Sequence, residues 1–259
     1  VLNIDLGGGA SRVISASDPG VDASNTINIT ALGGNSTLVV DGVQATINSL
    51  ASVSVGAAPT FVTQNGGSLT FNGGLLGVSL LDNTTFRIAD FSSITVNSPV
   101  LQALSAPTFD VQFSGTEDGR FNFVPGVDVV SNTTINAVGM EAGDQISLGG
   151  VLTGSYSAGT FTLTRQQLLG ATRVNIAMTP EEYAVFSANQ NVFFSNDTFT
   201  FPYNNQFFGT SAGDSIAGGE AGDIIYGGPT TAETGTGNDT ITAAGGNDTV
   251  RAGDGADLV

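Results

Sequence analysis

The C-terminal part of the chain repeats a short unit in which an Asp stands two positions before an apolar residue. The Asp residues follow one another at spacings of 9, 16, 9 and 9, at Asp214, Asp223, Asp239, Asp248 and Asp257. The apolar residues in the same phase are Ile216, Ile225, Ile241, Val250 and Val259. A flexible Gly-rich linker has no reason to keep Asp in phase with Ile or Val. The repeat therefore predicts coils with one short strand per unit, whose single apolar side chain points inward.

The residue types of the repeat are those of an oxygen-rich metal site. Glycine allows the positive φ angles of sharp turns, which expose main-chain carbonyl oxygens toward a common point, and each Asp adds a carboxylate. Calcium takes six to eight oxygens and tolerates mixed carbonyl and carboxylate shells. The candidate calcium ligands are Asp214, Gly222, Asp223, Gly235, Gly237, Asp239, Gly246, Asp248, Gly253, Gly255 and Asp257.

This repeat resembles the nonapeptide G-G-x-G-x-D-x-U-x of the RTX (repeats-in-toxin) calcium-binding family. The resemblance implies a parallel β-roll whose successive turns alternate between two edges, so that ions lie between turns 18 residues apart. Asp239 and Asp257 have that spacing. We expect Asp223 on the same edge, if the irregular stretch is a repeat two residues short. Asp214 and Asp248 then share the other edge without a proper partner between them.

The resemblance also has implications for export and for the extent of the protein. In the family, a C-terminal signal directs unfolded export by type I secretion, and calcium outside the cell drives folding. Because the repeats stop in mid-repeat, we expect the roll to continue past Val259. A weaker echo, from Met140 to Leu148, is similar to the Gly-Asp-x-Ile-x-Leu strand often seen beside RTX repeats. An ordinary turn and strand explain it, so we assign it no ligand role.

Charge supports a cationic ligand. The chain has 6 Lys+Arg against 23 Asp+Glu, a net charge of −17, which would repel nucleic acid and anionic membrane surfaces. Residues 209–259 hold eight acidic residues against Arg251 alone. Without cations this segment should repel itself, and its short strands bury too little apolar surface to offset chain entropy. We expect its folding to be coupled to calcium binding.

The remainder of the chain predicts an all-β fold, with β-sandwich-like or β-solenoid modules before the C-terminal calcium-binding parallel β-roll. Residues 1–127 show short runs of Val, Ile, Leu, Phe and Thr broken by Gly, Asn, Asp or Pro. Asp41-Gly42 between two such runs predicts a tight hairpin. The alternation in 109–113 and 121–123 predicts a second antiparallel pair. We therefore favour a sandwich-like module, with a solenoid as the alternative.

Residues 128–200 are expected to form a second β module with one short helix. Thr179 provides an N-cap, Pro180 stands at the first helical position, and Glu181 and Glu182 lie in the first turn. Residues 201–259 form the predicted RTX-type roll.

The chain lacks three residue types that are common in catalysis, His, Cys and Lys. There is no His or Cys, which excludes Ser-His-Asp and Cys-His arrangements and histidine- or thiolate-ligated zinc, and every basic residue is Arg. No apolar run approaches the roughly 18 residues of a membrane span. We predict a protein that is not an enzyme, has no membrane span and binds no nucleic acid.

The favoured function is that of a secreted, calcium-dependent structural protein of a bacterial surface layer or extracellular matrix fibre. Its expected partner is a further copy of itself, in an array or fibre, and cell-surface polysaccharide is a second candidate partner. One alternative is a segment of a large RTX adhesin, which needs a ligand-binding tip. Another is the export and folding module of a secreted RTX enzyme.

Overall fold

The computed structural model divides the 259-residue chain into two compact units, residues 1–179 with 194–201, and residues 180–193 with 202–259. The structure describes all residues except 19–25, 52, 55, 73–82, 98–105, 116–117, 125–131, 168–169, 189, 196, 203–205, 219–222, 232–234 and 244–247. Whether residues 1–127, 128–200 and 201–259 fold as separate domains stays a prediction.

In the first unit, the residues that the structure describes form two nine-stranded sheets. In spatial order, the first sheet consists of β1 (Leu2–Leu6), β3 (Thr26–Leu32), β5 (Gln44–Leu50), β7 (Ser68–Phe71), β9 (Ser93–Asn97), β11 (Arg120–Val124), β13 (Gln145–Ser147), β18 (Thr198–Thr200) and β17 (Phe194–Ser195). The second consists of β14 (Leu152–Ser157), β15 (Thr160–Gln167), β16 (Gly170–Ala177), β12 (Asn132–Val138), β10 (Thr108–Phe113), β8 (Thr85–Ile88), β6 (Thr60–Gln64), β4 (Thr37–Asp41) and β2 (Ser11–Ile14). A short 3-10 helix, η1 (Gly7–Gly9), follows β1.

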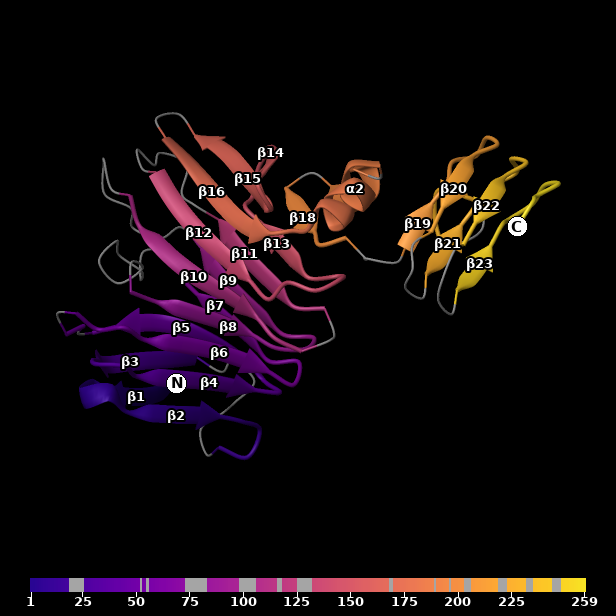
Figure 1. Ribbon diagram of the computed structural model, residues 1–259. Helices are drawn as coiled ribbons and strands as arrows, with labels where there is room; N and C mark the ends of the chain where they lie inside the picture. Colours follow the sequence, from indigo (N-terminus) through magenta and orange to yellow (C-terminus); the bar gives the residue numbers. More distant parts are fainter. Residues whose placement is uncertain are drawn as a thin grey trace. The chain divides into compact units, whose positions relative to one another are not determined.

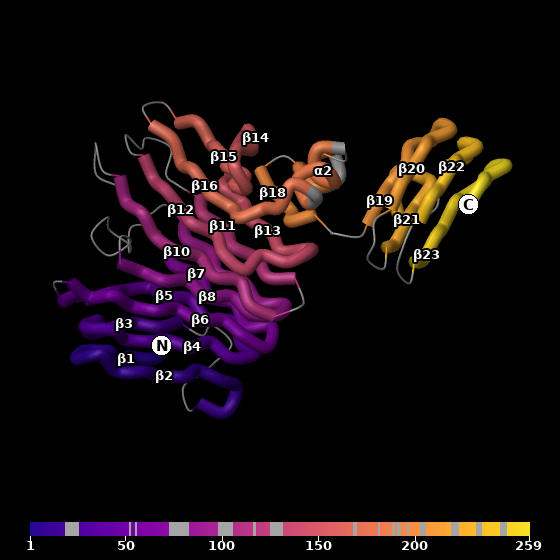
Figure 2. Tube along the Cα trace, viewed as in Figure 1, coloured from indigo at the N-terminus to yellow at the C-terminus, as the bar shows by residue number. Residues whose placement is uncertain are grey.

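The chain alternates between these sheets, which makes the unit a β-solenoid. Odd-numbered strands from β1 to β13 pair in parallel with one another, and even-numbered strands from β2 to β12 do the same in the second sheet. Leu69 pairs with Ile94 and Phe61 with Phe86, so that a coil takes 25 residues there. The coils stack in order along the unit, as the colour gradient shows (Figures 1 and 2). The all-β prediction is confirmed, in its solenoid form, and the favoured sandwich-like module is wrong because the successive coils pair in parallel.

Strand alternation fills the space between the two sheets with apolar side chains. In β7 and β9 every second residue is buried, and the intervening Ser, Thr and Asn face outward. Phe86 is fully buried, and its ring centroid lies 5.5 to 6.0 Å from those of Phe61, Phe71, Phe109 and Phe121. Because rings at such distances interdigitate closely, this phenylalanine stack forms the core of the unit.

Uncharged side-chain ladders run over the outer faces of the coils. Ser93 Oγ donates to Ser68 Oγ at 3.0 Å, and Asn72 Nδ2 donates to Asn48 Oδ1 at 3.0 Å. Thr46, Thr70 and Thr95 occupy matched positions on three successive strands. These ladders reinforce the register that the main chain sets.

Both hairpins predicted from the sequence are wrong. Asp41-Gly42 joins β4 to β5, and these strands lie in opposite sheets. Gly42 has the expected positive φ of 66°, but its turn carries the chain across the core and not back along the same sheet. Strands β10 and β11 likewise lie in opposite sheets. The alternating pattern was recognised, but two inner faces that pack on each other give the same pattern as an antiparallel pair.

Antiparallel strands occur where the regular coils end. β14, β15 and β16 pair antiparallel, and the turn Ala158-Gly159 between β14 and β15 has φ angles of 49° and 80°. β13 pairs antiparallel with β18. Both sheets therefore switch from parallel to antiparallel pairing at this end of the unit.

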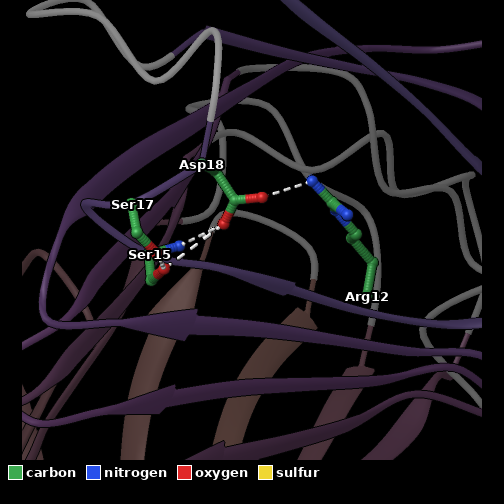
Figure 3. A network of polar contacts seen from close by, with 4 residues as sticks. All are labelled: Arg12, Ser15, Ser17 and Asp18. Atoms are coloured by element: carbon green, nitrogen blue, oxygen red, sulfur yellow. Dashed lines mark hydrogen bonds and ion pairs between the residues drawn. The ribbon is translucent and has the colours of Figure 1, made fainter.

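A polar turn closes the strand β2 (Figure 3). Asp18 Oδ2 accepts hydrogen bonds from Ser15 N at 2.9 Å and Ser15 Oγ at 3.3 Å, and Oδ1 pairs with the Arg12 guanidinium. Ser15 and Ser17 hydroxyls lie 2.9 Å apart. The Asp caps the main chain locally, as short polar residues do at turns.

A buried carboxylate links two coils near β13. Asp144, only 5% exposed, accepts hydrogen bonds from Gly119 N at 2.6 Å and from Glu141 N at 2.8 Å. Desolvation by burial raises the pKa of Asp144 to about 6, although the two main-chain hydrogen bonds act in the opposite direction. Gly119 lies one coil earlier than Asp144, so this side chain fastens neighbouring turns.

The described residues of the second unit form two helices and five short strands. These are α2 (Pro180–Ala188), α3 (Gln190–Phe193), β19 (Gln206–Phe208), β20 (Ser215–Ala217), β21 (Ile224–Tyr226), β22 (Thr240–Thr242) and β23 (Thr249–Arg251). The helix predicted to begin at Pro180 is confirmed. β19, β21 and β23 form one parallel sheet and β20 and β22 another. In the part of the chain that the structure describes, neither helix has the length and apolar character needed to cross a bilayer.

Truncating the centre of the phenylalanine stack should be costly. We expect Phe86→Ala to lower the free energy of unfolding of the first unit by about 3–5 kcal/mol, because it removes a fully buried ring and leaves a cavity. Urea unfolding followed by far-UV circular dichroism measures the change. Thr70→Ala, on the outer face of the same coils, serves as control and should change stability by less than about 0.5 kcal/mol. Equal effects of the two substitutions would contradict the assignment of the core.

The stability of the first unit should depend on the ionisation of Asp144. Its folded-state pKa of about 6 exceeds the unfolded value of 3.8, so the folded state binds the proton more tightly and stability falls as pH rises through this window. Relative to Asp144→Asn, the wild type should gain up to about 3 kcal/mol between pH 7 and pH 4. Urea midpoints of both proteins across this range test the expectation, and parallel pH profiles would refute it.

Candidate metal-binding edges

The strands of the second unit place the repeat Asp residues on two opposite edges. Ser215 pairs with Thr240, and Thr240 bridges to Leu258, so Asp214, Asp239 and Asp257 follow one another on one edge. Ile224 pairs with Thr249, so Asp223 and Asp248 share the other edge. We call these sets the first and the second Asp ladder. Each Asp directly precedes the strand or bridge residue of its own turn.

The irregular stretch changes which Asp residues share an edge. We expected Asp223 to join Asp239 and Asp257, with Asp214 and Asp248 opposite, and this arrangement is wrong. The residues that pair between β20 and β22 are 25 apart, against 18 for Thr240 and Leu258. The segment from Asp223 to Asp239 is thus one nine-residue repeat with seven additional residues. It is not two repeats of which one is two residues short.

Each ladder is held by a hydrogen bond from the main chain to a carboxylate. Asp214 N donates to Asp239 Oδ1 at 2.8 Å, and Asp239 N donates to Asp257 Oδ1 at 2.9 Å. On the second ladder Asp223 N donates to Asp248 Oδ1 at 2.9 Å. The sequence predicted these side chains as metal ligands but not as links between coils. The constant phase of Asp before each strand was the signal available for this role.

The other carboxylate oxygen occupies space that only glycine leaves open. A Cβ on Gly218 would stand 2.5 Å from Asp223 Oδ2, and one on Gly227 would stand 2.3 Å from Asp239 Oδ2. Real Cβ atoms do not approach oxygen so closely, so glycine at these turns forms a cradle around Oδ2. Asp239 therefore directs Oδ1 to the neighbouring coil and Oδ2 to the glycine turn at Gly227.

Further glycines bring the main chains of successive turns together. A Cβ on Gly237 would lie 2.3 Å from the carbonyl oxygen of Ala212, and one on Gly255 would lie 2.0 Å from that of Gly237. A Cβ on Gly235 would lie 2.7 Å from the Cα of Gly228. Gly253 has a positive φ of 92°. Carbonyl oxygens thus gather where the turns stack. Of the predicted ligands, Gly222 and Gly246 lie outside the described residues.

Burial of the carboxylates calls for a cation. Asp223 and Asp239 are each 2% exposed, and charge at such depth must be compensated. Arg251 is the sole basic residue of 201–259, and its guanidinium carbon stands 5.7 Å from the centroid of the Tyr226 ring. Among the described residues, no three acidic side chains gather at one point. A metal would therefore be held by carbonyl oxygens with one or two carboxylates, a hard-oxygen set that suits calcium.

The apolar side chains of the repeats fill the interior to different extents. Ile225 and Ile241 are buried as predicted, at 0% and 3% exposure, and Ile216 and Val250 are half-buried. Val259 was predicted to point inward and is 69% exposed, so that prediction is wrong. A core of this size stabilises the unit only weakly.

Deleting the seven additional residues should preserve the coils. Removal of residues 228–234 joins Gly227 to Gly235 and restores nine-residue spacing between Asp223 and Asp239. We expect the variant to keep both Asp ladders and to bind calcium at least as tightly, as measured by calorimetric titration. Deleting only residues 229–232 leaves Asp239 out of phase and serves as control. Equal loss of calcium binding in both variants would contradict the register.

The comparisons with known proteins agree with this geometry. Residues 199–229 and 230–259 match the family of the RTX calcium-binding nonapeptide repeat (4 copies). No curated protein and no solved structure shows a significant match to the chain. Residues 199–259 are RTX calcium-binding nonapeptide repeats, and calcium is the ion that they bind.

Proposed function

We propose that this chain is a calcium-dependent structural segment of a bacterial surface layer or extracellular matrix fibre. The observation that carries the proposal is the pair of Asp ladders, in which carboxylates accept main-chain hydrogen bonds from neighbouring coils and the side chains of Asp223 and Asp239 are buried. Such a segment needs a cation in order to fold, and RTX repeats are typical of secreted bacterial proteins. Folding would follow export to a calcium-rich exterior.

The charge balance supports folding that waits for calcium. Residues 201–259 carry eight acidic residues and one Arg, and Asp223 and Asp239 lie in the interior. Bringing these carboxylates together without a cation costs more than the few buried apolar side chains return. Calcium binding would then supply folding free energy directly.

The first unit supports a structural role. Its parallel coils are joined by main-chain ladders and by outward Ser, Thr and Asn ladders, which favour a rigid rod of repeated surface. RTX rolls and solenoids are typically structural and not catalytic. A repeated polar surface suits side-by-side association with further copies of the chain, and we propose such self-association as the route to an array.

Changing one buried ladder residue should weaken calcium-coupled folding of the second unit alone. In chelator, we expect peptides from 206–259 to exchange amide hydrogens rapidly, and in calcium to become protected. Asp239→Asn should raise the calcium concentration needed for protection by roughly tenfold or more, because one carboxylate charge is lost. Hydrogen exchange with mass spectrometry resolves this, with peptides of the first unit as an internal reference.

The matched control is Asp254→Asn. Asp254 belongs to the same segment and has the same charge, but it is exposed and lies outside both Asp ladders. It should titrate like the wild type. Protection without calcium would end the proposal of calcium-driven folding. Electron microscopy of the same samples tests the structural role, since the wild type should form ordered arrays or fibres in calcium, and strictly monomeric particles would argue against it.

A further inference from the structure

An exposed phenylalanine stands at a corner of the solenoid where the neighbouring coils have glycine. Ser93 pairs with Ser68, and Ser68 with Gln44, so Phe91 occupies the position of Gly66 and Gly42. All three have positive φ, at 55°, 75° and 66°. A bulky residue rarely adopts this left-handed conformation. The chain therefore accepts backbone strain at a place where glycine would be relaxed.

The strained residue gains nothing from packing. Phe91 is the third residue of the turn that Ser92 N closes with Ala89 O at 3.1 Å. Its side chain is 68% exposed, and among the described residues it is the only exposed Phe. Strain kept without burial points to a role outside the fold itself.

The ring borders a pocket of about 390 Å³ whose other walls are polar. Its lining residues are Phe91, Ser92, Ser93, Asp118, Gly119, Arg120 and Asn122. This volume lies within the range of small-molecule sites. The pocket belongs to the first unit and shares no residue with the Asp ladders.

The floor of the pocket is fixed before any ligand arrives. Arg120 N donates to Ser92 O at 2.9 Å, and Asn122 Nδ2 donates to Thr95 Oγ1 at 3.1 Å. Gly119 N donates to Asp144 Oδ1, and a Cβ on Gly119 would stand 3.0 Å from both Ile88 and Phe113. The main chain at Gly119 and Arg120 is thus held closely against the core.

The chemistry of the walls selects the class of ligand. Asp118 accepts hydrogen bonds, Arg120 donates them, and Asn122 does both. Asp118 and Arg120 are exposed, and among the described residues their side chains form no hydrogen bond with each other or with a neighbour. Their opposite charges favour a neutral ligand. A sugar ring has a face of C–H groups, which an aromatic ring attracts, and a rim of hydroxyls that both donate and accept.

We propose that Phe91, Asp118, Arg120 and Asn122 form a binding site for a neutral saccharide. The Phe91 ring takes the C–H face of one sugar unit, and the Asp118 and Arg120 side chains hydrogen-bond with its hydroxyls. This activity goes beyond the calcium-dependent structural role, and its loss would leave calcium-driven folding unchanged.

The test uses the full chain in calcium with a panel of neutral oligosaccharides, namely maltotetraose, mannotetraose and N-acetylchitotetraose. Saturation-transfer NMR and calorimetric titration should detect binding of at least one. Phe91→Gly should weaken that binding by roughly tenfold or more, while its unfolding midpoint stays equal or rises, because glycine relaxes the strained turn. Arg120→Gln should weaken the same binding without moving the midpoint.

Ala158→Gly is the matched control, since Ala158 also has a positive φ, of 49°, and lies in the first unit outside the pocket. It should relax its own turn and bind like the wild type. The proposal fails if no member of the panel binds, or if Phe91→Gly binds as tightly as the wild type. Binding that Phe91→Gly abolishes but Ala158→Gly preserves supports it.

Discussion

Main-chain hydrogen bonds between successive parallel coils are the interaction on which both units depend. A single coil cannot bury its apolar face by itself. Burial requires that the next coil continue the same register. In the first unit Leu69, Ile94 and Phe121 follow one another in this way. Side-chain ladders and buried carboxylates add to an order that the main chain has already imposed.

The coils of the two units are held together by different interactions. Coils in the first unit are wide enough to enclose phenylalanine rings, and dispersion and apolar burial hold them. Coils in the second unit take 18 residues, or 25 where the seven additional residues lie, and enclose single Ile side chains. Because these coils bury little apolar surface, calcium binding has to supply the remaining folding free energy. Asp144 is an intermediate case, because it fastens Gly119 of the preceding coil much as Asp239 fastens Asp214.

Sequence reasoning reached the all-β class, the RTX roll and the helix at Pro180, because each depends on local patterns. It failed where the structure depends on pairing between strands that are far apart in the sequence. Asp41-Gly42 has the composition of a hairpin turn and joins two sheets, whereas Ala158-Gly159 lacks the usual Asn or Asp and makes a true hairpin. The edges were misassigned because spacing alone does not tell a long half-turn from a shortened repeat. The constant phase of the Asp residues is visible in the sequence, but which of them are linked, at 18 or 25 residues apart, could be seen only in three dimensions.

The change from parallel to antiparallel pairing at β14 to β16 makes this end of the solenoid different from a parallel edge. A parallel edge can accept another coil of the same kind, but β14 presents an antiparallel strand whose residues after Leu152 are largely exposed on both faces. On the opposite side, β17 contributes only two residues to the edge of its sheet. Edges this short or this polar discourage further strand addition. At this end of the solenoid, a further coil of the same kind therefore cannot simply continue the parallel stack.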